Sequence, residues 1–95
     1  MAQAIYEYTF DIKMPDYNGM VVFYCYDNVS KRLNDALCLM YNELEAQLYA
    51  TDSARSMITL TNCSLDNSSS TLTATIGSDY GLNIKAAYIA PPSLR

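Results

Sequence analysis

The chain has 95 residues and is 51% hydrophobic, which is enough apolar material for one core and predicts a single domain over residues 1–95. It contains nine tyrosines but no histidine and no tryptophan, so the usual general base and a frequent metal ligand are missing. Ten acids oppose six bases, for a net charge of −4, which argues against direct binding to nucleic acid.

The first predicted strand covers residues 4–14. Its even positions, which include Tyr6 and Tyr8, are apolar or aromatic, whereas its odd positions are polar except Ile5. A period of two with one polar face is typical of an antiparallel strand on a core. Residues 15–19 then predict a hairpin loop, because an Asn-Gly pair tolerates the positive φ that such turns need.

Residues 20–26 predict a second strand that is apolar on both faces. Phe23 and Cys25 alternate there with Tyr24 and Tyr26, so one of the two pairs faces the core. We expect Tyr24 and Tyr26 on the exposed side, because their hydroxyl groups need water or a partner.

A helix is predicted from about residue 30 to Ala50, because its apolar side chains form one stripe at about 100° per residue. The stripe consists of Leu33, Ala36, Leu37, Met40, Leu44 and Leu48. Glu43 and Glu45 lie near the predicted C-terminal end, where the helix macrodipole disfavours acids, so helix stability does not explain them. Off the stripe, an apolar set of Leu39, Ala46 and Tyr49 lies beside Asp35 and Asn42. Together with Glu43 and Glu45, this outer helix face predicts a docking surface.

Three more strands are predicted at residues 57–65, 71–76 and 82–90, separated by polar turns. The alternation slips at Asn62-Cys63, which predicts a bulge or a strand end. The order ββαβββ predicts an α+β fold, in which one antiparallel sheet of about five strands carries the helix on one face. The other face, rich in threonine, is expected to contact solvent.

The three cysteines, Cys25, Cys38 and Cys63, are far apart in the sequence. A disulfide framework or a zinc site needs closer, paired spacing, so we expect reduced thiols, no metal and no cofactor. The first residues include no basic segment and no long apolar run, which predicts neither a signal peptide nor a membrane span. We therefore expect a cytoplasmic protein, in the cytoplasm of the host cell if the chain is viral.

Catalysis is not expected. A nucleophile needs a base within reach, and the chain has neither a histidine nor a Ser-x-x-Lys arrangement. Glu43 and Glu45 would point about 200° apart on a helix, which prevents them from acting as a paired acid and base.

The leading hypothesis is a small acidic binding protein. Such chains are typical of viral or mobile-element inhibitors that block a nucleic-acid-binding complex of host defence by protein–protein contact, so the expected partner is a protein with a basic surface. Tyr17 and Tyr80 lie in predicted loops, each beside an acid, and loop aromatics often make contacts. The candidate contact residues are Tyr17, Tyr24, Tyr26, Asp35, Leu39, Asn42, Glu43, Glu45, Tyr49, Asp79 and Tyr80.

The alternative is a structural or assembly subunit, such as a minor phage component or a self-associating module. In that case the second strand, apolar on both sides, would form the seam of a homodimer.

Overall fold

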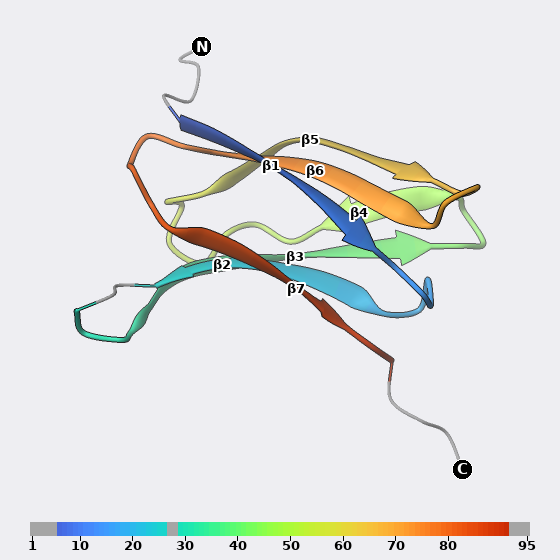
Figure 1. The fold of residues 1–95 in the computed structure, drawn as a ribbon, viewed down its shortest axis with the longest axis horizontal. Coiled ribbons are helices and arrows are strands. Elements are labelled where there is room, and N and C mark those ends of the chain that lie inside the picture. The colour runs from blue at the N-terminus through green and yellow to red at the C-terminus, as the bar shows by residue number, and fades with distance from the viewer. Residues whose placement is uncertain (1–5, 27–28, 92–95) are drawn as a thin grey trace.

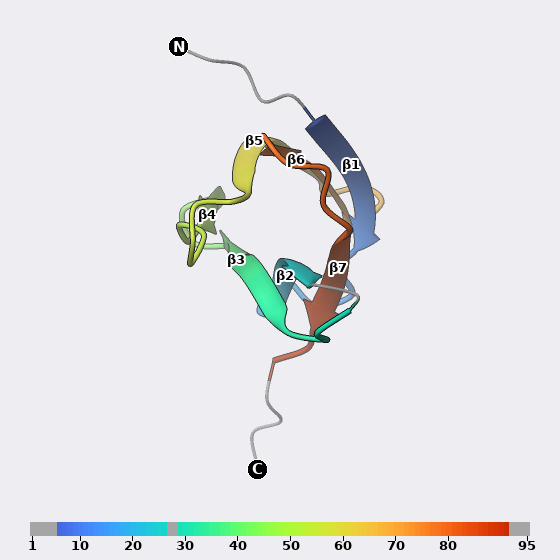
Figure 2. The ribbon, with the colours of Figure 1, turned by 90° about the vertical axis from the view of Figure 1, so that its left-hand side faces the viewer.

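The computed structural model describes residues 6–26 and 29–91. The regular elements of this part of the chain are seven β-strands. Their bounds are Tyr6–Lys13 (β1), Met20–Tyr26 (β2), Leu33–Asn42 (β3), Gln47–Ala50 (β4), Thr59–Asp66 (β5), Thr71–Ser78 (β6) and Ile84–Ile89 (β7). They form a three-stranded sheet in the order β1-β6-β5 and a four-stranded sheet in the order β4-β3-β2-β7. The two antiparallel sheets face each other around the core (Figures 1 and 2).

The predicted α+β fold with a helix is wrong. The segment predicted as a helix forms β3 and β4, which pair as an antiparallel hairpin. Along β3, Asp35, Leu37 and Leu39 are buried, while the residues between them point outward. The outward residues Ala36 and Met40 are apolar as well, so the strand lacks the polar and apolar alternation that distinguishes it from a helix.

The predicted hairpin between the first two strands is also wrong, although the chain does turn there. β1 pairs with β6, whereas β2 pairs with β3 and β7, so residues 14–19 carry the chain from one sheet to the other. Gly19 is required at this crossing for space, because a Cβ would lie 2.6 Å from the carbonyl oxygen of Ile89 and 2.7 Å from the Tyr88 ring. The Tyr88 hydroxyl fastens the crossing by donating to the Asp16 carbonyl oxygen at 2.9 Å.

The other predicted strands are present in the structure. Residues 20–26 form β2, with Phe23 and Cys25 buried and the two tyrosines on the outer side, as predicted. The last three strands correspond to β5, β6 and β7, and the bulge in β5 lies between Leu60 and Asn62. Tyr6 is exposed rather than in the core. The start predicted for the first strand, at residues 4 and 5, lies outside the described residues.

Asp35 lies in the core, only 1% exposed, rather than on the exposed surface predicted for it. Its carboxylate accepts backbone hydrogen bonds from Ala36 at 2.9 Å, Arg55 at 2.8 Å, Met57 at 2.8 Å and Ile58 at 3.2 Å. Burial alone would raise the pKa of this carboxyl group, but the four N–H donors outweigh burial and hold the pKa below its ordinary value. Asp35 thereby ties β3 to the loop that leads into the other sheet.

We expect Asp35→Asn to lower the free energy of unfolding by about 1–3 kcal/mol, because an amide nitrogen would face buried N–H donors that need an acceptor. A pKa lowered by folding stabilises the native state above the unfolded pKa of about 3.9, and this contribution is lost as the pH falls through the native pKa. Urea unfolding should therefore show a difference in the free energy of unfolding between wild type and variant at about pH 7, and this difference should become smaller below about pH 4.

Asp79→Asn is the control for this prediction, since Asp79 is exposed. Equal stability of Asp35→Asn and wild type near neutral pH, or a gap that widens in acid, would contradict the structural role given to Asp35.

Candidate functional site

The four-stranded sheet has an apolar outer surface. On β2, one of its two central strands, Met20 lies opposite Met40 and Ile89, and Val22 lies opposite Cys38 and Ala87. Cross-strand partners point to the same side of a sheet, so these side chains form one continuous surface, which we call the apolar face. Its members are Met20, Val22, Tyr24, Tyr26, Ala36, Cys38, Met40, Tyr49, Lys85, Ala87 and Ile89.

Several side chains of the apolar face remain open to solvent. Met40 is 41% exposed, Tyr49 43% and Ile89 47%, and Lys85 is the one charged member. Contiguous apolar surface of this kind marks interaction sites in soluble proteins.

The outer face of the three-stranded sheet is polar by comparison. Thr9 and Thr75 hydroxyl oxygens lie 3.1 Å apart, and the Thr73 hydroxyl donates to the Asp11 carboxylate at 2.7 Å. Ser64 continues the same row on β5, opposite Thr73. The two outer faces of the sandwich therefore differ in chemistry, and the apolar one is the candidate site.

Tyr24 and Tyr26 lie at one end of the apolar face. Their rings stack at a centroid distance of 6.3 Å and an angle of 17°, and both are half-buried. Leu33, opposite Tyr26, is exposed, although the sequence placed it in the core. An exposed leucine beside two stacked rings extends the apolar surface toward the β2–β3 loop.

At the other end of the face, the turn between β3 and β4 carries Glu43, Leu44 and Glu45, which we call the acidic tip. Leu44 is 99% exposed. The Glu45 N–H donates to the Asn42 side-chain oxygen at 3.2 Å, and the Tyr49 hydroxyl donates to the Glu45 carboxylate. That hydrogen bond raises the pKa of Tyr49 above its ordinary value.

The structure thus brings four of the predicted contact residues together, Asn42, Glu43, Glu45 and Tyr49, by a β-hairpin instead of a helix face. A pocket of about 430 Å³ adjoins them, between the acidic tip and Asn18.

The remaining candidates lie elsewhere. Leu39 is buried in the core. Tyr17 is half-buried, and its ring packs edge-on against Tyr41 of β3 at 5.2 Å. Its hydroxyl donates to the Asn67 carbonyl oxygen at 3.5 Å, so Tyr17 connects the β1–β2 crossing to β3 and to the β5–β6 turn. Asp79 and Tyr80 are exposed in the β6–β7 loop, at the end of the sandwich opposite the acidic tip (Figure 1).

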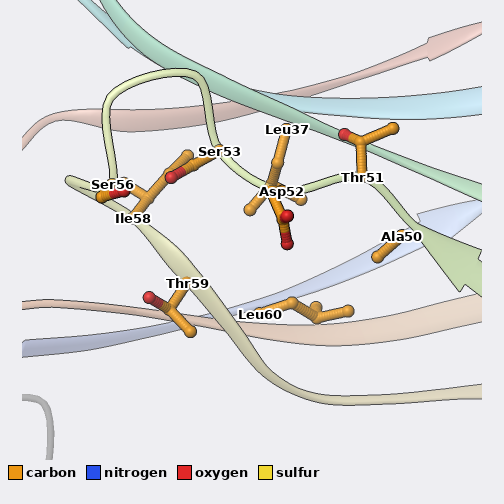
Figure 3. Close-up of a pocket in the computed structure, with 9 residues that line it drawn as sticks. All are labelled: Leu37, Ala50, Thr51, Asp52, Ser53, Ser56, Ile58, Thr59 and Leu60. Carbon is orange, nitrogen blue, oxygen red and sulfur yellow. The ribbon is translucent and has the colours of Figure 1, made fainter.

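A second pocket, of about 540 Å³, opens between the β4–β5 loop and β5 (Figure 3). Leu37 and Ile58 form its buried floor, and the exposed Asp52 points toward its middle. Asp52 is the one ionisable group among the described residues that line it, so the pocket offers no acid and base pair. It is rimmed by exposed hydroxyl side chains and would leave much of a ligand in water, unlike sites that bury most of the ligand surface.

Within residues 6–26 and 29–91, no group of three His, Cys, Asp or Glu side chains is arranged to hold a metal ion. The same residues include no helix long and apolar enough to cross a membrane. No family model, curated protein or solved structure matches this chain.

The turn that presents the acidic tip contains a strained position. Ala46 has a φ of 54°, in the left-handed region that costs a residue with a Cβ about 1–2 kcal/mol. We expect Ala46→Gly to raise the free energy of unfolding by up to about 1 kcal/mol, because glycine adopts this conformation without that cost.

Ala50→Gly, four positions later in β4, is the matched control, since glycine within a strand costs about 0.5–1 kcal/mol relative to alanine. Urea unfolding of the two variants should move in opposite directions. A loss of stability in both would contradict the strain assigned to Ala46.

Proposed function

We propose that the protein is a non-catalytic binding protein that covers a surface of another protein molecule with its apolar face. The observation that carries this proposal is the difference between the two outer faces, one apolar and partly exposed, the other covered with threonine and other polar groups.

The energetics support contact through this face. Complete burial of one large apolar side chain contributes about 1.5–3 kcal/mol, so covering the exposed parts of Met40, Tyr49 and Ile89 contributes roughly 2–4 kcal/mol. The tyrosines of the face add rings whose hydroxyl groups can bond to a partner, a combination enriched in protein interfaces.

The acidic tip sets the electrostatic preference of one end of the face. Glu43 and Glu45 are exposed and adjoin Tyr49, so a partner surface carrying lysine or arginine at its rim would be steered toward the tip. This feature supports the inhibitor hypothesis, in which the partner is a basic protein of a host-defence complex. The free cysteines Cys25, Cys38 and Cys63 are consistent with a reducing compartment, and we propose the cytoplasm.

The assembly hypothesis is the second candidate, and the distribution of charge around the apolar face favours it. Both hypotheses use the same face and differ in what occupies it.

Met40→Glu should weaken partner binding, because it places a charge on an exposed apolar part of a surface that must lose its water on contact. The tagged protein is expressed in its native host, and captured proteins are quantified by mass spectrometry. We expect the captured amount of a true partner to fall at least about tenfold in the Met40→Glu sample. A tenfold loss of affinity corresponds to an interface contact that contributes about 1.4 kcal/mol.

Ser64→Glu is the control, since Ser64 is exposed on the outer face of the other sheet and the change adds the same charge. Circular dichroism checks that both variants are folded. A partner captured equally well by Met40→Glu and by wild type would contradict the role of the apolar face. So would a partner whose captured amount falls equally with Ser64→Glu.

A further inference from the structure

The charges around the apolar face are separated into two ends. Lys31 and Arg32 lie in the β2–β3 loop, and Lys85 projects from the face at the level of Tyr24. Glu43 and Glu45 lie at the opposite end, in the β3–β4 turn (Figure 1). All five charged side chains are exposed, so the apolar face has a basic end and an acidic end.

Other charges near these ends strengthen or qualify the separation. Arg55 in the β4–β5 loop adds to the basic end, and Asp16 in the β1–β2 crossing adds to the acidic end. Asp52 follows Thr51, whose N–H donates to the Cys38 carbonyl oxygen near the middle of the face, and Asp52 points into the pocket between the β4–β5 loop and β5 (Figure 3). Asp79 lies at the basic end, in the loop that leaves the three-stranded sheet.

We propose that the apolar face docks against the apolar face of a second copy of this chain, in a twofold dimer with the strands of the two faces running in opposite directions. This inference rests on the proposed function and names the partner of the same site. A twofold interface presents the same surface on both subunits and must therefore be complementary to itself.

Charge decides between the two ways of placing the faces together. A twofold axis parallel to the strands would set basic end on basic end and acidic end on acidic end. An axis across the strands sets the basic end of each copy over the acidic end of the other, twice. Like charges facing each other oppose association, and complementary ends fix its orientation, so the second arrangement is the one selected.

The size of the face agrees with a dimer that uses its charged ends. Four strands at about 4.8 Å spacing and seven residues at about 3.4 Å give a footprint of roughly 450 Å². A standard interface covers about 800 Å² on each partner. The loops at both ends must supply the remaining area, which places Lys31 and Arg32 of one copy beside Glu43 and Glu45 of the other.

An axis across the middle of the face passes near Val22 and Cys38, which are opposite each other in the sheet. Residues near the axis meet their own counterparts, so the two Cys38 thiols face each other across the interface. Cys63, by contrast, lies on β5 in the other sheet and packs against the core.

Sedimentation equilibrium over a range of concentrations tests the dimer directly. We expect a reversible dimer for the wild type and for Ser64→Glu, and a weakening of at least about tenfold for Met40→Glu. A monomer at every concentration, or a dimer that Met40→Glu leaves intact, would overturn the inference.

Charge reversal tests the orientation. Arg32→Glu and Glu43→Arg should each weaken the dimer, by about tenfold at low ionic strength, and the double variant should recover most of the loss because the reversed charges face each other again. The effects should shrink as salt is added. Single variants that change nothing, or a double variant weaker than both, would overturn the antiparallel arrangement.

A short bis-maleimide supplies a geometric readout. It should link two copies through Cys38, so Cys38→Ser should lose the covalent dimer and Cys63→Ser should keep it. Linkage that depends on Cys63 would overturn the face-to-face geometry.

The two levels of proposal fail differently. If the protein is monomeric and Met40→Glu loses a captured foreign partner, the dimer is overturned while the proposed binding function stands. If Met40→Glu changes neither the molecular mass in solution nor the set of captured proteins, both the dimer and the binding function of the apolar face would be overturned.

Discussion

The buried carboxylate of Asp35 is the interaction on which the sandwich depends. The chain passes from the four-stranded to the three-stranded sheet through residues 51–58, and the carboxylate binds three backbone N–H groups in that loop. Ser78 acts on the same loop from the other sheet, since its hydroxyl donates to the Met57 carbonyl oxygen at 2.8 Å and accepts from the Tyr80 N–H at 3.0 Å. The two buried polar residues among those described, Asp35 and Ser78, thus satisfy backbone groups where the chain crosses between layers, which a purely apolar core could not do.

Asp35 also determines which side of β3 faces outward. Both sides of this strand are largely apolar, so hydrophobicity alone distinguishes them poorly. A shift by one residue would exchange the two sides of the strand, burying Met40 and exposing Leu37. It would also carry the carboxylate into solvent and leave the N–H groups of the loop without an acceptor, at a cost of about 1–3 kcal/mol for each buried group. The apolar face of β3 therefore points outward because the Asp35 carboxylate, on the other side of the strand, must be buried to accept the hydrogen bonds of the loop.

The sequence predicted the strands whose two sides differ or whose ends are marked by turn residues. β6 could be predicted because Leu72, Ala74 and Ile76 alternate with threonines. β2 could be predicted because turn residues precede it. The prediction for β3 failed on both counts. Its outward residues Ala36, Cys38 and Met40 are apolar like its buried ones, and the turn after it contains Ala46 in a left-handed conformation, where glycine or asparagine would have signalled a turn. The acids of the tip were identified from their misplacement in a helix, whereas the burial of Asp35 has no local signal, because its four hydrogen-bond donors include three from residues about 20 positions away.

Net charge and charge position lead to different partners for this chain. The excess of acids predicted a basic partner, and the acidic tip retains that preference. The positions of Lys31, Arg32 and Lys85 add that the chain itself carries a basic end on the same face, opposite the acidic tip. A second copy and a foreign basic protein would contact the same residues and so exclude each other. Self-association would then keep the apolar face out of water until a partner with a better fit displaces the second copy, and the apparent affinity for that partner would fall as the concentration of the chain rises.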